Sequence, residues 1–372
     1  MRAIKESCVT ALSLLIGTAC IFTGCSWSSA KAKEATKVPE VQEKEDALRR
    51  ESGELYIYQQ LTEDEKNCYD IIYTGFMNKD KDIDLSDYSN QTIQDIYEAI
   101  HAEHSEIFWV RGYELSTIDG PDGYTAKYMN PNYIRRVNDI AIAKTDIDKA
   151  VDPILESVAN MNSYDKSKYL YQWICDHTVY QSGTNDQDIR SVFIEGRSVC
   201  QGYASAYQYL LSKSGIKSFV LRGIHDGELH AWVAAKIGDS WYYSDPTLGD
   251  AGFRSPSGMR NFIDYSYFNM TEDECAKTHY SLSNVVLPNG NSDWNSYFIK
   301  ERLYFNVYDE EKVCKRIQEE YKSQDYIILK FGSKDERKKA ADSLFTDAVL
   351  ANYITDTDVI YLSSGEKLII FR

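Results

Sequence analysis

Residues 198–247 read SVCQGYASAYQYLLSKSGIKSFVLRGIHDGELHAWVAAKIGDSWYYSDPT and contain, in this order, a cysteine, a histidine and an aspartate. Small and apolar residues recur at helical spacing from Ala204 to Leu211, which predicts a helix that begins at Cys200 and ends near Gly215. The first N–H groups of a helix lack intrahelical partners, and with the helix dipole they favour a thiolate over a thiol. Cys200 is therefore placed as a nucleophile would be.

Three strands are expected after this helix. The first covers residues 218–223, and the next two, 229–237 and 241–244, flank the turn dipeptide Gly238-Asp239. Pro246 has no N–H for a ladder and should end the last strand. The segment therefore predicts a hairpin beside the helix.

The hairpin brings His230 and Asp245 together. A loop over residues 236–239 would place them directly opposite each other, and a two-residue turn would leave them as diagonal neighbours on one face. In either register the carboxylate reaches the imidazole, fixes its tautomer and leaves the other ring nitrogen for the thiol. Each of the three residues taken singly is usually structural, but the combination favours a catalytic arrangement.

Three short motifs resemble those of the transglutaminase-like superfamily, which has a papain-like cysteine fold. They are Val199-Cys200-Gln201-Gly202-Tyr203-Ala204, His230-Ala231-Trp232 and Asp245-Pro246-Thr247. One departure is Val233, which stands where many members have Asn. The resemblance extends from near Val151 to His279 and implies an α+β fold with a thiol enzyme's triad at Cys200, His230 and Asp245.

The resemblance also implies residues around the triad. Gln201 matches a position next to the nucleophile, and Tyr180 matches an aromatic residue that relatives hold near the oxyanion site. The backbone N–H groups of Cys200 and Gln201 are the expected oxyanion donors. Tyr267-Phe268 and His279 match a trailing motif, and we interpret them as packing and supporting residues.

The composition excludes several other classes of function. The chain of 372 residues has a formal net charge of −16 and no basic patch, which argues against nucleic-acid binding. No CxxC pair is present, so a zinc or redox site is not expected. His101 and His104 are a pair without a third ligand nearby. We therefore expect no metal and no cofactor.

The N-terminus predicts export and lipidation. Arg2 and Lys5 precede an apolar run from residue 9 to 22, and Thr23-Gly24-Cys25 follows, which resembles a bacterial lipobox. We expect a signal peptide at 1–24, lipid attachment at Cys25, a flexible tether at 25–54 and a location on the outer face of the bacterial cell membrane. Cys20 is a weaker lipidation candidate, and an uncleaved N-terminal anchor helix is the alternative.

The rest of the chain divides into an N-terminal α+β segment at 55–150, the core at 151–282 and a small C-terminal α+β module at 283–372 with the order βαβαββ. In the N-terminal segment we expect helical periodicity over 56–77, opening at the capping-box pattern Thr62-Glu63-Asp64-Glu65, and a second helix at 92–103. In the C-terminal module we expect its first strand at 297–306.

The function predicted from these observations is cleavage of peptide or amide bonds through a thioester, with a protein or peptide substrate that includes cell-wall peptides. The alternatives are acyl transfer to an amine, a non-catalytic peptide or cell-wall binding module, and a scaffold lipoprotein. Short loops around the predicted cleft leave little chain for a lid that would exclude water, which favours hydrolysis over transfer.

Overall fold

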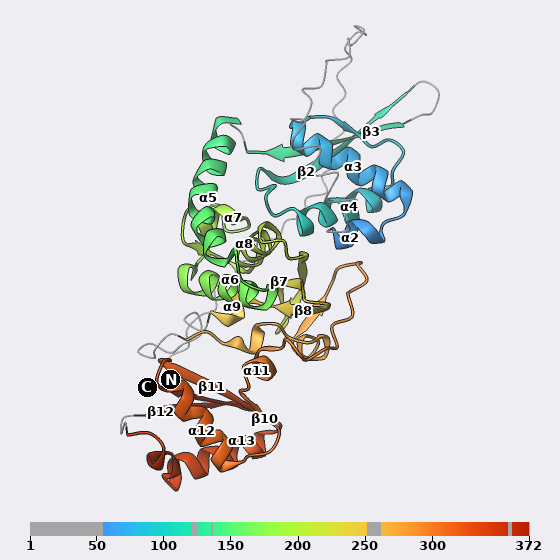
Figure 1. Cartoon of the computed structure of the whole chain (residues 1–372). Helices are drawn as coiled ribbons and strands as arrows, with labels where there is room; N and C mark the ends of the chain where they lie inside the picture. The colour runs from blue at the N-terminus through green and yellow to red at the C-terminus, as the bar shows by residue number, and fades with distance from the viewer. Residues whose placement is uncertain (1–54, 121–124, 135–136, 251–261, 356–358, 372) are drawn as a thin grey trace, which may run out of the picture. The chain divides into compact units, whose positions relative to one another are not determined.

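The computed structural model describes residues 55–120, 125–134, 137–250, 262–355 and 359–371 (Figure 1). The predicted signal peptide, lipidation site and tether lie outside these ranges. Within them, no helix combines the length and the apolar character that crossing a membrane would require.

The N-terminal segment begins with two helices in place of the one predicted at 56–77. A short helix α2 (Tyr56–Gln60) is separated from α3 (Glu63–Asn78) by Thr62, whose side chain and Glu65 form a capping box. The capping box predicted at Thr62 is thus confirmed as the start of the main helix, and the periodic residues before it form a separate short helix. The remaining elements are β1 (Ile83–Asp84), α4 (Asn90–Glu103), β2 (Val110–Asp119) and β3 (Thr125–Tyr133), with the antiparallel strand order β1-β3-β2.

The long helix α5 (Val137–Val158) leads into the core and runs across the expected boundary at residue 150. It is followed by α6 (Ser163–His177), β4 (Val179–Tyr180), α7 (Ile189–Phe193), β5 (Arg197–Ser198) and α8 (Cys200–Lys213). Buried apolar residues from Ile57 to Cys275 form one cluster, so the N-terminal segment and the core share a hydrophobic interior.

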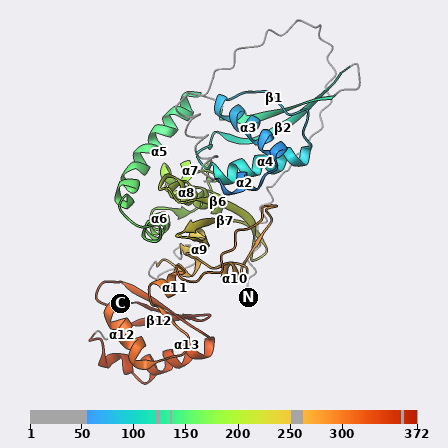
Figure 2. The same cartoon turned by 45° about the vertical axis from the view of Figure 1, so that its right-hand side comes forward.

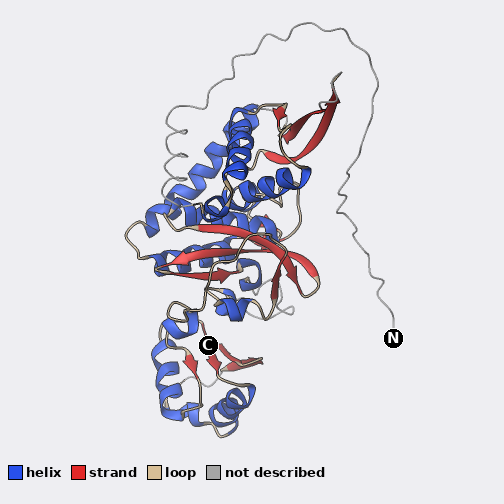
Figure 3. Ribbon diagram, turned by 90° about the vertical axis from the view of Figure 1, so that its right-hand side faces the viewer, coloured by secondary structure: helices blue, strands red, loops and turns tan. Residues whose placement is uncertain are grey.

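The central sheet holds four antiparallel strands in the order β8-β7-β6-β9 (Figure 3). They are β6 (Ser218–His225), β7 (Glu228–Ile237), β8 (Ser240–Ser244) and β9 (His279–Ser281). Between β8 and β9 come α9 (Pro246–Gly249), η2 (Tyr265–Tyr267) and α10 (Glu272–Cys275). Pro246 ends the strand as predicted, and it does so by opening α9.

The turn between β7 and β8 contains two residues. Ile237 pairs with Ser240 across Gly238-Asp239, and Gly238 has a φ of 64°. Val233 pairs with Ser244 in the same ladder, so His230 and Asp245 are diagonal neighbours, the second of the two predicted registers.

The C-terminal module has a hydrophobic interior of its own, formed by buried residues from Phe298 to Phe371. Its elements are α11 (Tyr297–Lys300), β10 (Tyr304–Phe305), α12 (Glu310–Glu320), β11 (Tyr326–Phe331), α13 (Lys334–Ala341), η3 (Asp342–Thr346), η4 (Val349–Asn352), β12 (Ile360–Ser364) and β13 (Lys367–Phe371). The strand predicted at 297–306 was wrong, because residues 297–300 are helical and only Tyr304–Phe305 pairs with β11. Figure 2 shows α12 and α13 beside the four-stranded sheet β10-β11-β13-β12.

Candidate active site

Cys200 is the first residue of α8, as predicted from the sequence. The preceding residue, Val199, makes no side-chain cap, so the first N–H groups of the helix are left to other partners. Cys200 is partly exposed, whereas the other described cysteines are buried, namely Cys68, Cys175, Cys275 and Cys314. Burial raises the pKa of the Cys68 thiol to about 12 and that of Cys314 to about 11, and it raises the pKa of Cys175 and Cys275 as well. Cys200 is thus the accessible thiol of the described chain.

Gly202 sets how closely the start of α8 packs. A Cβ at this position would lie 2.0 Å from Ser198 Oγ and 2.7 Å from Ser191 Oγ. The two hydroxyl oxygens are themselves hydrogen-bonded at 2.7 Å and buried. The glycine after Cys200-Gln201 is therefore required by the space available and not by backbone conformation.

His230 hydrogen-bonds a carboxylate through one ring nitrogen. Its Nε2 lies 2.7 Å from Asp245 Oδ2, and the neighbouring side chain of Cys200 contributes to the pKa of the ring. Burial opposes the charge on the imidazole, but the negative charge and hydrogen bond of Asp245 outweigh it and raise the pKa of His230 to about 10, with a contribution from Cys200. The geometry supports a protonated imidazole beside the thiol.

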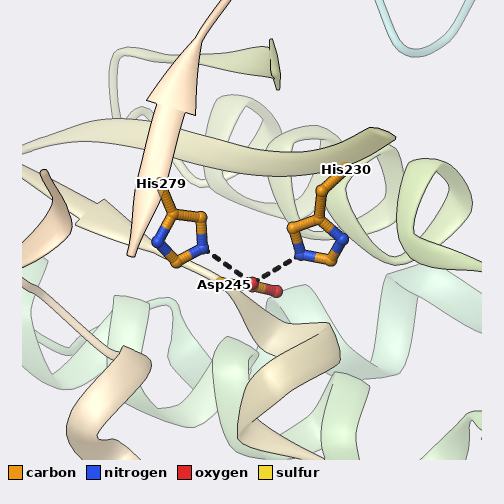
Figure 4. Close-up of side chains that lie close together, drawn as sticks. All are labelled: His230, Asp245 and His279. Carbon is orange, nitrogen blue, oxygen red and sulfur yellow. Dashed lines mark hydrogen bonds and ion pairs between the residues drawn. The ribbon is translucent and has the colours of Figure 1, made fainter. Parts of the chain in front are cut away.

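Asp245 is fully buried and its carboxylate is surrounded by donors. Oδ1 accepts the backbone N–H groups of Thr247 at 2.9 Å and Leu248 at 3.1 Å, because Asp245 caps α9. Oδ2 accepts from His230 and also from His279 Nε2 at 3.1 Å (Figure 4). Burial alone would raise the pKa of this carboxyl, but the charge and hydrogen bond of His230, with those of His279, hold it well below its usual range.

The direct hydrogen bond from His279 to Asp245 was not predicted from the sequence, which indicated only a supporting residue near the site. His279 begins β9, which pairs with β6 on the side away from β7. This pairing brings the imidazole of His279 to Asp245. The Nδ1 atom of His279 lies 2.9 Å from Thr278 Oγ1. The signal in the sequence was the trailing motif, but local spacing could not give this contact because 34 residues separate the partners.

A metal ion is a second use that this cluster permits. The ligand atoms of His230, Asp245 and His279 lie within 4.8 Å of one another, and two imidazoles with a carboxylate are ligands that zinc accepts. Both Nε2 atoms lie at hydrogen-bonding distance from the same oxygen, however, so hydrogen bonds alone account for the arrangement.

The side chain of Gln201 is engaged at both ends of its amide. Its Oε1 accepts from Arg222 Nε at 2.8 Å and its Nε2 donates to Ser205 Oγ at 3.0 Å. Both atoms of this side-chain amide are therefore already hydrogen-bonded, and the backbone N–H of Gln201 as an oxyanion donor stays a prediction.

Tyr180 lies on β4 and is partly exposed. Burial raises the pKa of its phenol, and the neighbouring charge of Cys200 raises it further. Tyr180 pairs with Ser198 in the ladder of β4 and β5, so its strand lies beside the segment that leads into Cys200. Cys25 lies outside the described residues.

Comparison with known proteins identifies one part of the chain. Residues 153–246 match the model of the transglutaminase-like superfamily. A search of curated proteins gave no match.

Three of the similar solved structures show how far the likeness extends. A transglutaminase is 18% identical over 42% of this chain and 48% of its own, with a TM-score of 0.28, so this chain spans about half of that protein. A candidate cysteine protease from Cytophaga hutchinsonii is 16% identical over 49% of this chain and 80% of its own, with a TM-score of 0.26. The periplasmic domain of TgpA from Pseudomonas aeruginosa is 16% identical over 38% of this chain and 65% of its own, with a TM-score of 0.24.

Proposed function

We propose that the protein is a thiol enzyme that cleaves peptide or amide bonds, since residues 153–246 match the model of the transglutaminase-like superfamily. The observation that carries the proposal is the 2.7 Å contact of His230 Nε2 with the buried carboxylate of Asp245, beside the partly exposed thiol of Cys200, which contributes to the pKa of the same ring. A thiol, a base and a residue that orients the base are the parts that nucleophilic catalysis requires.

In the first half of the proposed reaction, the sulfur of Cys200 attacks the amide carbonyl carbon as a thiolate, while its proton is held by the imidazolium of His230. The backbone N–H groups at the start of α8 stabilise the oxyanion that forms. The C–N bond then breaks, His230 returns the proton to the leaving amine, and a thioester remains on Cys200. Asp245 holds the Nε2–H of His230 throughout and stays ionised.

In the second half, water attacks the thioester and His230 takes a proton from it. The C–S bond breaks, the carboxylic acid leaves, and the thiolate of Cys200 is restored beside the protonated His230. An amine in place of water would give acyl transfer, the alternative that the family also offers. We favour hydrolysis because Cys200 is partly exposed, which allows water to reach the thioester.

We also propose that the enzyme acts outside the cell, held to the membrane by a lipid on Cys25. The support is the basic start, apolar run and Thr23-Gly24-Cys25 end of the N-terminus. The residues that follow Cys25 would then tether the folded part.

The proposed activity is tested by incubating the protein with a peptide library and sequencing the new termini by mass spectrometry. New termini should appear with the native chain and should be absent with Cys200→Ala. Identical product lists from the two proteins would refute the proposal.

A further inference from the structure

Five residues near the active-site ends of three neighbouring strands form a surface that the proposed reaction does not use. In the ladders, Ile224 of β6 lies between Leu229 of β7 and Tyr280 of β9. Two residues earlier on β6, Arg222 receives the backbone N–H of Leu282 on its carbonyl oxygen at 3.0 Å. Alternate residues of a strand share a face, so all five side chains lie on the same face of the sheet. We call them the strand-end patch.

The apolar members of the strand-end patch are unusually exposed. Leu229 is 60% exposed, Tyr280 is 69% exposed and Leu282 is 54% exposed, and the three surround Ile224 and Arg222. Single exposed apolar residues are common on proteins, but neighbouring ones on adjacent strands indicate a surface that another molecule covers.

A cation lies in the middle of this apolar surface. Arg222 is exposed, and its Nε donates to the neutral amide of Gln201 at 2.8 Å. Among the residues that the structure describes, no carboxylate lies within ion-pair distance of Arg222. This is notable in a chain whose formal net charge is −16. A guanidinium held at Nε still presents its outer N–H groups, which match a carboxylate.

The patch adjoins the proposed reaction centre through α8. Arg222 contacts Gln201, the residue that follows the nucleophile. His230 pairs with Gly223 and so lies on the other face of the sheet from Leu229. A substrate that lies on the patch therefore approaches Cys200 from the side of Gln201, with the residues beside its reacting amide on the patch.

We propose that the strand-end patch is a substrate-binding surface that selects peptides with an apolar side chain next to a carboxylate. This inference rests on the proposed function, since it names the substrate class of the same site. The carboxylate binds Arg222, and the apolar side chain covers Leu229, Ile224 and Tyr280.

The first experiment measures specificity with two fluorogenic peptide amides. Both contain a leucine, and the residue next to this leucine is Glu in one peptide and Gln in the other. The native chain should cleave the Glu peptide with a kcat/KM roughly tenfold higher, the discrimination that a charge-assisted contact gives. In Arg222→Met the ratio should fall to about one, because the methionine keeps the length of the side chain without its charge. Lys236→Met removes a cation from the far end of β7 and should keep the ratio of the native chain. An unchanged ratio in Arg222→Met would overturn the inference.

The second experiment separates this inference from the proposed activity. Binding of the same peptides, labelled with a fluorophore, is measured by polarisation on the Cys200→Ala chain, which needs no turnover. The Cys200→Ala chain should bind the Glu peptide more tightly than the Gln peptide. If the double variant, Cys200→Ala with Arg222→Met, loses this preference, the patch is supported even when the native chain cleaves neither peptide. Cleavage of both peptides without any preference in binding would leave the activity standing and refute the patch.

Discussion

His279 Nε2 lies 3.1 Å from Asp245 Oδ2, the same oxygen that His230 Nε2 reaches at 2.7 Å. One carboxylate oxygen thus accepts two imidazole N–H groups, while the other oxygen accepts two backbone N–H groups. Both rings must carry a proton on Nε2, which assigns the tautomer of each when it is neutral. Asp245 is held in orientation by four donors, and in the proposed mechanism it positions His230.

Loss of the His279 hydrogen bond should weaken catalysis without abolishing it. His279→Leu removes a donor to a charged group, so kcat/KM should fall by roughly 10- to 100-fold. The pKa of Asp245 should rise, because one of the hydrogen bonds that lowers it is lost, and the acid limb of the pH–rate profile should move to higher pH.

His279→Gln is the matched control for that variant, because its amide nitrogen can replace Nε2 as a donor. It should recover most of the rate and return the acid limb toward the native position. Equal losses in the two variants would show that His279 contributes volume only.

Chelation with EDTA should leave the native rate unchanged, because hydrogen bonds account for the cluster. A loss of rate that zinc restores would instead favour a metal at His230, Asp245 and His279.

Asp245→Asn should lower the rate and shift the alkaline limb of the pH–rate profile. The native imidazole should remain protonated until the pH approaches its pKa of about 10, so activity should persist into the alkaline range and fall there. The amide removes the negative charge that raises this pKa, so the limb should move to lower pH. The loss in kcat/KM should be on the order of 10²- to 10⁴-fold. Circular dichroism should show an intact fold, and an unshifted limb would contradict the role given to Asp245.

Cys200 should be the thiol that alkylating reagents modify first. It is partly exposed at a helix start, whereas Cys68, Cys175, Cys275 and Cys314 are buried and their pKa values are raised. Iodoacetamide labelling followed by peptide mass spectrometry should find Cys200 at neutral pH before the others. The rate at which Cys200 is labelled should drop in His230→Ala. Equal labelling of all five described cysteines would refute the assignment.

The partition of the thioester between water and amine should favour water. With a glutamine-containing peptide and an excess of a primary amine, hydrolysed product should exceed the amine adduct at modest amine concentration, since the thiol is accessible to solvent. Mass spectrometry separates the two products. A dominant adduct would make the enzyme a transferase.

Cys25→Ala should abolish lipid labelling of the protein in its native host. A labelled fatty acid fed to the cells should mark the native protein, and the variant should be released or remain as an uncleaved precursor. Continued labelling of the Ala variant would point to Cys20 or contradict the lipobox.

The parts of the site that were predictable from the sequence are those governed by local rules. The helix start at Cys200 follows from periodicity, and the His230–Asp245 contact follows from a tight turn between two strands that alternate residues across faces. Each depends on residues within a hairpin or a single helix.

The unpredicted contacts join segments that only tertiary folding brings together. His279 reaches Asp245 because β9 pairs with β6, and Arg222 reaches Gln201 from a strand 21 residues away. The helical start of the C-terminal module at 297–300 also went unpredicted, because a short Tyr-Phe-Ile segment has strand propensity and tertiary packing overrides it.

The burial of four of the five described thiols has a consequence for the enzyme in an oxidising medium. If Cys200 is oxidised to a sulfenic acid, the buried cysteines cannot resolve it by forming a disulfide unless the fold opens. Since none of the other described thiols can serve, rescue would fall to a small thiol or a reductase in the surroundings, and without rescue the oxidation continues to irreversible acids. The working lifetime of the protein would then depend on the redox state of its environment as much as on the stability of its fold.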